Sequence, residues 1–204
     1  MIKSTTYEYE ERAFLNEADF RNVKRYLDDN ALSKQLDNKQ SFFFVLPDVN
    51  ISIAASSTDV KVKYKGGQLG NGNGFEEKEF NIVPESLHDA IAMFSSLLKV
   101  SPQESYQFRI NYTFENHIEI ALKYTQMWGF HLEVERVYAA DERTLKQEKA
   151  RSARLLDDFA NNLELSYITN EEMSEFKKQC ERGQNRGDYS TEQFREKYGE
   201  LFSL

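Results

Sequence analysis

The feature that most constrains this fold is a charged strand pattern that recurs along the first 140 residues. In an extended chain successive side chains point to opposite faces. The segment YEYEERAF therefore places Glu8, Glu10 and Arg12 on one face. Lysines take the corresponding alternate positions in VKVKYKGG, namely Lys61, Lys63 and Lys65. One early strand thus carries acids and a base on a single face, and a later strand carries only bases.

Four later segments repeat this alternation, each with apolar residues on the opposite face. Their charged positions are Glu77 and Glu79 in FEEKEFNIV, Arg109 in YQFRINYTF, Glu119 and Lys123 in HIEIALKYT, and His131, Glu133 and Glu135 in FHLEVERVY. Apolar residues at helical spacing predict amphipathic helices at 16–29 and 84–99, and helices throughout 141–204. The predicted order is a strand, a helix, four strands, a helix, three strands and then helices.

Two interpretations of the charged faces are open. A half-buried sheet turns its apolar face to the core and its charged face to water. Alternatively, the sheet closes into a barrel whose apolar outer face is covered by helices, so that the charges line an interior. The sorting of charge by strand favours the barrel, because buried charges require opposite charges nearby. Carboxylates combined with basic side chains suit Mg²⁺ or Mn²⁺ together with a bound polyphosphate.

Composition narrows the classes of protein further. The 34 acids against 26 bases give a net charge of -8, which opposes a general affinity for nucleic-acid backbone or anionic lipid. Apolar runs such as FFFVL are too short to span a membrane, and the N-terminus lacks the pattern of a signal peptide. With its single cysteine, Cys180, the chain cannot form an internal disulfide. We expect a cytoplasmic protein.

The ordered motifs resemble those of the CYTH proteins, the triphosphate tunnel metalloenzymes. Glu8-x-Glu10-x-Arg12 resembles the family's ExExK signature, with Arg in place of the usual Lys. YKGG is similar to its lysine-glycine strand end, EEKEF to its next acidic strand, WGFHLEVERV to its late acidic strand, and REKYGELF to its tyrosine-containing ending. The resemblance covers nearly the whole chain in the correct order.

This resemblance implies an α+β fold: an eight-stranded antiparallel β-barrel, or tunnel, with helices packed on the outside and a helical C-terminal segment. A single CYTH-like domain is expected over 1–204. Its tunnel strands and two helices would occupy 1–140, and its C-terminal helices would cover the barrel from 141–204.

The resemblance also implies an enzyme, a phosphohydrolase dependent on Mg²⁺ or Mn²⁺. Its substrate would be a small molecule with a triphosphate group, either inorganic tripolyphosphate or a nucleoside or other organic triphosphate. Two alternatives stay open: a class IV-type adenylate cyclase, and a noncatalytic module that binds nucleotides or polyphosphate. No membrane partner is expected, an RNA 5′ triphosphate end is the one nucleic-acid substrate left open, and a homodimer is also left open.

The site residues follow from the strand faces and the resemblance. The catalytic candidates are Glu8, Glu10, Glu133 and Glu135. The substrate-binding candidates are Arg12, Lys61, Lys63, Lys65, Arg109 and Lys123. The candidate metal ligands are Glu8, Glu10, Glu77, Glu79, Glu133 and Glu135.

Several positions depart from the family's pattern or allow two interpretations. Ser52 and Ala54 stand where the family has a pair of arginines, and Lys123 stands where it commonly has an acid. His131 is either a structural histidine or a general acid or base, with the structural role favoured. Trp128 is expected to pack against helices rather than to stack on a nucleobase.

Overall fold

The computed structural model describes residues 5–46, 49–66, 75–182 and 184–202. The strands are β1 (Thr5–Phe14), β2 (Ser33–Leu36), β3 (Lys39–Val45), β4 (Val49–Ala55), β5 (Val60–Gly66), β6 (Phe75–Ile82), β7 (Gln103–Phe114), β8 (Ile118–Thr125) and β9 (Gly129–Ala140). The helices are α1 (Glu17–Asn30), α2 (Leu87–Leu98), α3 (Leu145–Asn162), α4 (Asn170–Glu181) and α5 (Thr191–Tyr198). Short 3₁₀ segments are η1 (Pro84–Ser86), η2 (Glu115–His117) and η3 (Gly199–Phe202).

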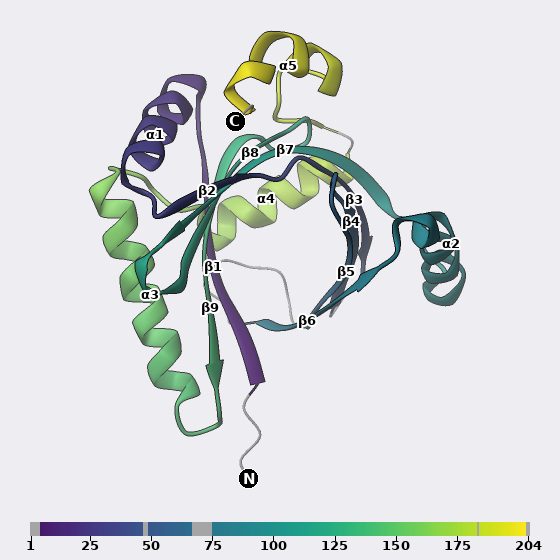
Figure 1. Cartoon of the computed structure of the whole chain (residues 1–204), viewed down its shortest axis with the longest axis horizontal. Coiled ribbons are helices and arrows are strands. Elements are labelled where there is room, and N and C mark those ends of the chain that lie inside the picture. Colours follow the sequence, from purple (N-terminus) through teal and green to yellow (C-terminus); the bar gives the residue numbers. More distant parts are fainter. Residues whose placement is uncertain (1–4, 47–48, 67–74, 183, 203–204) are drawn as a thin grey trace.

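The strands form one antiparallel sheet that closes on itself (Figure 1). Neighbouring strands follow the order β7, β3, β4, β5, β6, β1, β9 and β8. The barrel closes because β8 also pairs with β7. The ninth strand, β2, pairs with the same strand as β3, since both lie against β7 at successive positions. The eight-stranded antiparallel barrel predicted from the sequence is therefore confirmed, with one of its walls interrupted between β2 and β3.

The apolar face of the sheet points outward and is covered by helices, because the charged face cannot pack against them. Phe20 and Leu27 of α1 and Phe194 of α5 are fully buried on this outer face. Phe194 stacks on Tyr124 of β8 with 3.7 Å between ring centroids. On the far side of the barrel, α2 packs Phe94 against Phe44 of β3. These contacts hold the barrel wall from outside.

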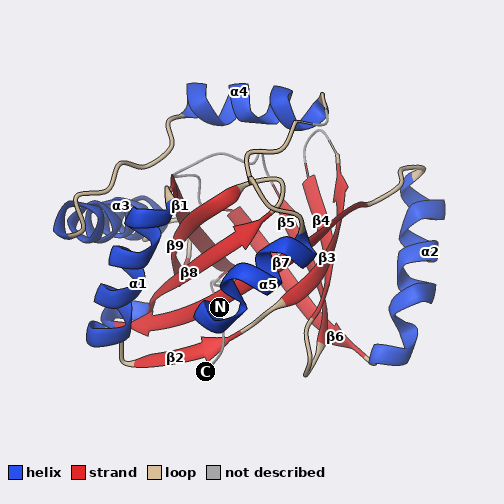
Figure 2. Cartoon of the chain, turned by 90° about the horizontal axis from the view of Figure 1, so that it is seen from above, coloured by secondary structure: helices blue, strands red, loops and turns tan. Residues whose placement is uncertain are grey.

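One C-terminal helix departs from the expected arrangement. We expected the helices of 141–204 to cover the outside of the barrel, and α3 and α5 do so. Helix α4 instead lies across one end of the barrel (Figure 2). Its Met173 and Phe176 reach into the tunnel's lining, and Phe176 packs against Trp128 with 4.5 Å between ring centroids. An apolar stripe indicates that a helix covers something, but the stripe does not say whether it covers a wall or an opening.

Among the residues that the structure describes, no helix combines the length and the apolar character needed to cross a lipid bilayer.

One carboxyl group of β1 faces the helices rather than the tunnel. Glu11 is half-buried on the outer face. Burial, with the negative charge of Asp157 on α3 adding to it, raises the pKa of Glu11 to about 7, although a hydrogen bond from Tyr9 acts in the opposite direction. A carboxyl group whose pKa is higher in the folded than in the unfolded chain destabilises the fold once it ionises.

We expect Glu11→Gln to stabilise the protein at alkaline pH. The wild type loses stability as the pH rises from the ordinary value of 4.5 through about 7, and glutamine removes this loss. At pH ~8 the midpoint of thermal unfolding should rise by about 2–4 °C, and the gain should vanish near pH ~4.5. Glu142→Gln, at an exposed position, is the control. A gain that is the same at both pH values would contradict the expectation.

Candidate functional site

The interior of the barrel is a cavity of about 740 Å³. It is lined by the charged strand faces, which confirms the barrel interpretation over that of a solvated sheet face. Of the substrate-binding candidates, all six line it: Arg12, Lys61, Lys63, Lys65, Arg109 and Lys123. The end covered by α4 is lined instead by apolar and sulfur-containing side chains, namely Met127, Trp128, Met173, Phe176 and Cys180. The cavity therefore combines a charged middle with an apolar end.

Three of the predicted acids meet inside the tunnel. Glu8, Glu10 and Glu135 each place one carboxylate oxygen within 4.8 Å of the others. The register explains this, because Glu10 is paired directly with Glu135 between β1 and β9, and Glu8 lies two residues away on the same face. Glu8 is 2% exposed and Glu10 is 1% exposed. We call these three residues the acid cluster.

Basic side chains compensate part of the charge of the acid cluster. The Nζ of Lys65 lies 2.5 Å from Oε1 of Glu8 and 3.3 Å from Oε2 of Glu10. Arg12 forms an ion pair with Glu10 as well. Burial works against ionisation of Glu10, but Arg12 and Lys65 together hold its pKa below the ordinary value. Glu10 is therefore a charged carboxylate.

Glu135 is the member of the acid cluster with the least compensation. Burial raises its pKa, and the positive charges of Arg109 and Lys65 do not offset this effect. No ion pair within 4.0 Å involves Glu135 in the described part of the chain. Three carboxylates that gather with incomplete compensation suit a hard divalent cation, since Mg²⁺ and Mn²⁺ prefer oxygen ligands. The residues present therefore fit a metal ion.

Glu133 has other partners than the acid cluster. Its carboxylate forms an ion pair with Lys123 and accepts a hydrogen bond from Nε of Arg12 at 3.2 Å. Burial opposes its ionisation, but Lys123 and Arg12 hold its pKa well below the ordinary value. Because Lys123 and Glu133 approach each other across β8 and β9, the lysine compensates the glutamate within the protein. Glu133 thus contacts the basic side chains, whereas Glu135 belongs to the acid cluster.

Of the other two candidate metal ligands, Glu79 is not part of the acid cluster. Glu79 pairs with Lys63 at 3.2 Å and with Lys61 at 3.5 Å. The side chain of Glu77 lies outside the described residues. Ser52 and Ala54 of β4 are paired with Lys63 and Lys61, respectively, in the register. These lysines therefore lie directly beside the positions where the family has arginines.

A polar network that was not predicted from the sequence lies on the wall formed by β2, β3 and β7. Lys39 Nζ lies 2.9 Å from Oδ2 of Asp37, and Nδ2 of Asn111 donates to the same oxygen at 3.1 Å. Arg109 Nε lies 3.6 Å from this oxygen and also donates a hydrogen bond to Asn111. Alternation of Asp37, Lys39 and Ser41 was the signal that could have revealed this network, but the adjacent run SFFFVLP reads as purely apolar.

His131 and Trp128 lie at the apolar end of the cavity. His131 is 3% exposed, and its Nδ1 lies 2.9 Å from the carbonyl oxygen of Gly129. Burial, with the nearby charge of Lys123, lowers its pKa to about 4, so the ring is neutral near pH 7. Trp128 packs against Phe14, Phe176 and the His131 ring. The favoured roles, structural for His131 and packing for Trp128, agree with these contacts.

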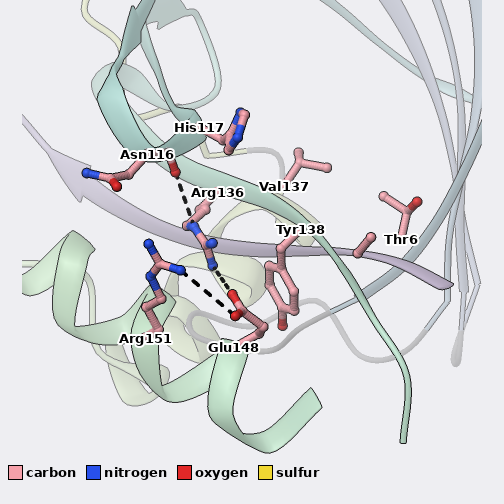
Figure 3. Close-up of a pocket in the computed structure, with 9 residues that line it drawn as sticks. Thr6, Asn116, His117, Arg136, Val137, Tyr138, Glu148 and Arg151 are labelled. Carbon is pink, nitrogen blue, oxygen red and sulfur yellow. Dashed lines mark hydrogen bonds and ion pairs between the residues drawn. The ribbon is translucent and has the colours of Figure 1, made fainter. Parts of the chain in front are cut away.

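A second pocket, of about 690 Å³, lies outside the tunnel between β9, η2 and α3 (Figure 3). Its central side chain, Arg136, donates from Nη1 to Glu148 at 2.9 Å and from Nε to the carbonyl oxygen of Asn116 at 3.2 Å. Nη1 also donates to Ser152 at 2.9 Å. Arg136 thus attaches α3 to the barrel wall, and we assign it a structural role.

Comparison with known proteins agrees with this geometry. No family model and no curated protein matches the sequence. Among solved structures, a protein of Pyrococcus horikoshii superposes with a TM-score of 0.60 at 19% identity, over 78% of this chain and 91% of its own. A candidate adenylate cyclase of Vibrio parahaemolyticus gives 0.53 at 17% identity, over 78% and 90%. A Hippeastrum protein described as having a dominant triphosphatase activity gives 0.53 at 14% identity, over 79% and 89%.

At these identities the likeness establishes the fold. The chain shares its overall fold with these solved structures over more than three quarters of its length.

Proposed function

We propose that this protein is a divalent-metal-dependent phosphohydrolase that acts on a triphosphate group bound inside the tunnel. The observation that carries the proposal is the acid cluster, with three carboxylate oxygens within 4.8 Å of one another in a cavity lined by basic side chains. Carboxylates without bases would suit a cation alone, and bases without carboxylates would suit an anion alone. Together they suit a metal ion and a polyphosphate.

Each part of the site has a role in this proposal. Glu8, Glu10 and Glu135 would hold Mg²⁺ or Mn²⁺, which when bound polarises a phosphoryl oxygen and activates water. Lys65, now against Glu8 and Glu10, would be released toward the phosphates once a cation neutralises those carboxylates. Arg12 lies between the acid cluster and Glu133 and would bind phosphate with its planar guanidinium. These groups offset charge on the phosphates that are not transferred.

The opposite wall of the tunnel would hold the remaining phosphates. Arg109 and Lys39 lie on the β2, β3 and β7 wall, and their partner Asp37 fixes their positions. Lys61 and Lys63 supply positive charge beside Ser52 and Ala54. A lysine is a point charge without the bidentate geometry of arginine. We therefore expect one phosphate to be bound more weakly. The lysines at this place favour the second candidate function, a noncatalytic polyphosphate or nucleotide sensor.

The first experiment is product analysis of the purified protein with Mg²⁺ or Mn²⁺. Inorganic tripolyphosphate, ATP and thiamine triphosphate are each offered, and the products are separated. We expect metal-dependent release of inorganic phosphate. Pyrophosphate with cyclic AMP from ATP would identify a cyclase instead. No turnover, combined with a rise in the unfolding temperature on adding tripolyphosphate and metal, would identify a binding module and overturn the proposal.

A further inference from the structure

An exposed apolar surface lies outside the tunnel and has no role in the proposed function. Four of the six large apolar side chains that are exposed in the described chain gather at the end of β6 and on α2. They are Phe80 at 58%, Val83 at 60%, Met93 at 58% and Leu97 at 70%. With the exposed Ala92 and Ser96 of the same helix, we call them the α2 patch. Helix α2 stands at the side of the barrel away from the other helices (Figure 1).

Helix α2 is apolar on two sides. Its inner side packs Leu87, Ile91, Phe94 and Leu98 against the cluster around Phe44 and Val62. A surface helix normally turns a polar face to water. Here the outer side carries Met93 and Leu97 beside exposed polar residues such as Asp89 and Ser96. Apolar side chains concentrated in one exposed area mark an interaction surface, whereas scattered ones do not.

The charges at the two ends of α2 indicate which partner fits. Asp89 lies in the first turn, and Lys99 is the C-cap residue. Both are exposed, and neither forms an ion pair within the described chain. They are ten residues apart, or about 15 Å along a helix axis. An antiparallel copy of the same helix would place its own Lys99 beside Asp89 and its own Asp89 beside Lys99.

We propose that two copies of this chain associate through their α2 patches, with the two α2 helices antiparallel around a two-fold axis. Such a contact is self-complementary, because each surface meets its own copy. Ala92 and Ser96 allow the helices to approach closely, while Met93 and Leu97 fill the grooves beside them. The net charge of -8 makes two copies repel each other over most of their surface. A patch whose charges pair across the axis is therefore where they can meet.

Sedimentation velocity over a concentration series tests the proposal. The patch is one helix and its flank, so we expect a monomer–dimer equilibrium in about the micromolar range, at the weak end for protein interfaces. Leu97→Lys should weaken dimerisation by more than about tenfold, because it places a charge in the apolar centre. Leu32→Lys is the matched control, since Leu32 is 68% exposed but lies between α1 and β2. It should leave the equilibrium unchanged.

Exchange of the two charges tests the antiparallel arrangement. Asp89→Lys and Lys99→Asp should each weaken the dimer, because each places like charges opposite one another. The double variant should restore the affinity of the wild type to within about threefold. A wild type that stays monomeric at all concentrations would overturn the proposal. So would a loss of dimer in Leu32→Lys equal to that in Leu97→Lys, or a double variant no better than the single ones. Circular dichroism confirms that each variant is folded.

Discussion

Replacement of Glu10 by glutamine is expected to lower metal-dependent hydrolysis of the triphosphate by about a thousandfold. Glu10 is the central member of the acid cluster, because Arg12 and Lys65 both contact it and Glu135 faces it in the register. Glutamine keeps the shape but removes one negative charge from the metal site. Phosphate release at increasing Mn²⁺ concentrations measures the effect, with a higher Mn²⁺ requirement expected alongside the lower rate.

Glu79→Gln is the matched control for this experiment. Glu79 is also an acid in an alternating strand, β6. Its partners, however, are Lys61 and Lys63 rather than the residues of the acid cluster. Its loss should change the rate by less than about tenfold, because the acid cluster stays intact. Equal losses in the two variants would contradict the assignment of the metal to Glu8, Glu10 and Glu135. Retention of the wild-type rate in Glu10→Gln would contradict it as well.

The second large effect is expected on stability, from Phe194→Ala. Phe194 is fully buried where α5 meets the barrel, stacked on Tyr124 and in ring contact with Phe108 and Phe130. Removal of a buried phenyl ring leaves a cavity that the rigid wall cannot fill. We expect the free energy of unfolding to fall by about 3–5 kcal/mol. Urea-induced unfolding followed by circular dichroism measures it.

Phe80→Ala supplies the comparison for the stability experiment. Phe80 is 58% exposed on β6, so its removal opens no cavity. At a protein concentration where the chain is monomeric, the change should stay within about 0.5 kcal/mol. A loss for Phe194→Ala that is as small as this would show that α5 is dispensable for the stability of the barrel.

Ser52 and Ala54 on β4, at the positions where the resembling family has arginines, affect which triphosphate we expect the protein to use. Ser52 and Ala54 line the cavity and offer no positive charge, while the lysines paired with them, Lys63 and Lys61, are partly exposed and engaged with Glu79. Among the lysines and arginines that line the cavity, the most deeply buried lie on other walls, at Arg12 and Lys123. We therefore expect β1 and β8 to contribute more to phosphate binding than β4. Substrate comparison across tripolyphosphate and organic triphosphates shows how much this asymmetry matters.

Much of the site was accessible from the sequence because strand alternation is a local property. Side chains two residues apart share a face, so Glu8, Glu10 and Arg12 were placed together without any tertiary information. Acids and bases are concentrated on different strands, and this distribution also indicated that the charged face was enclosed. The same reasoning separated Glu135 from Arg136, which points outward to α3.

Other features depended on contacts between distant segments. The choice between Glu133 and Glu135 as the third member of the acid cluster depends on Lys123, which reaches Glu133 from the neighbouring strand. Both glutamates have the same local pattern. Lys39 and Asp37 were hidden beside an apolar run, and only pairing of β2 and β3 with β7 placed them opposite Arg109.

The sequence by itself therefore determined the type of each strand face and the residue types that line the interior, because these follow from alternation and from the need to compensate buried charge. The eight-stranded antiparallel barrel was implied by the resemblance of the ordered motifs to a known family. Only the tertiary structure decided which acids meet, that α4 covers an end of the tunnel rather than its wall, and that α2 exposes an apolar side. The reason is physical, because strand register and helix placement are set by packing between segments far apart in the chain. The local pattern of residues does not say which of these segments pack together.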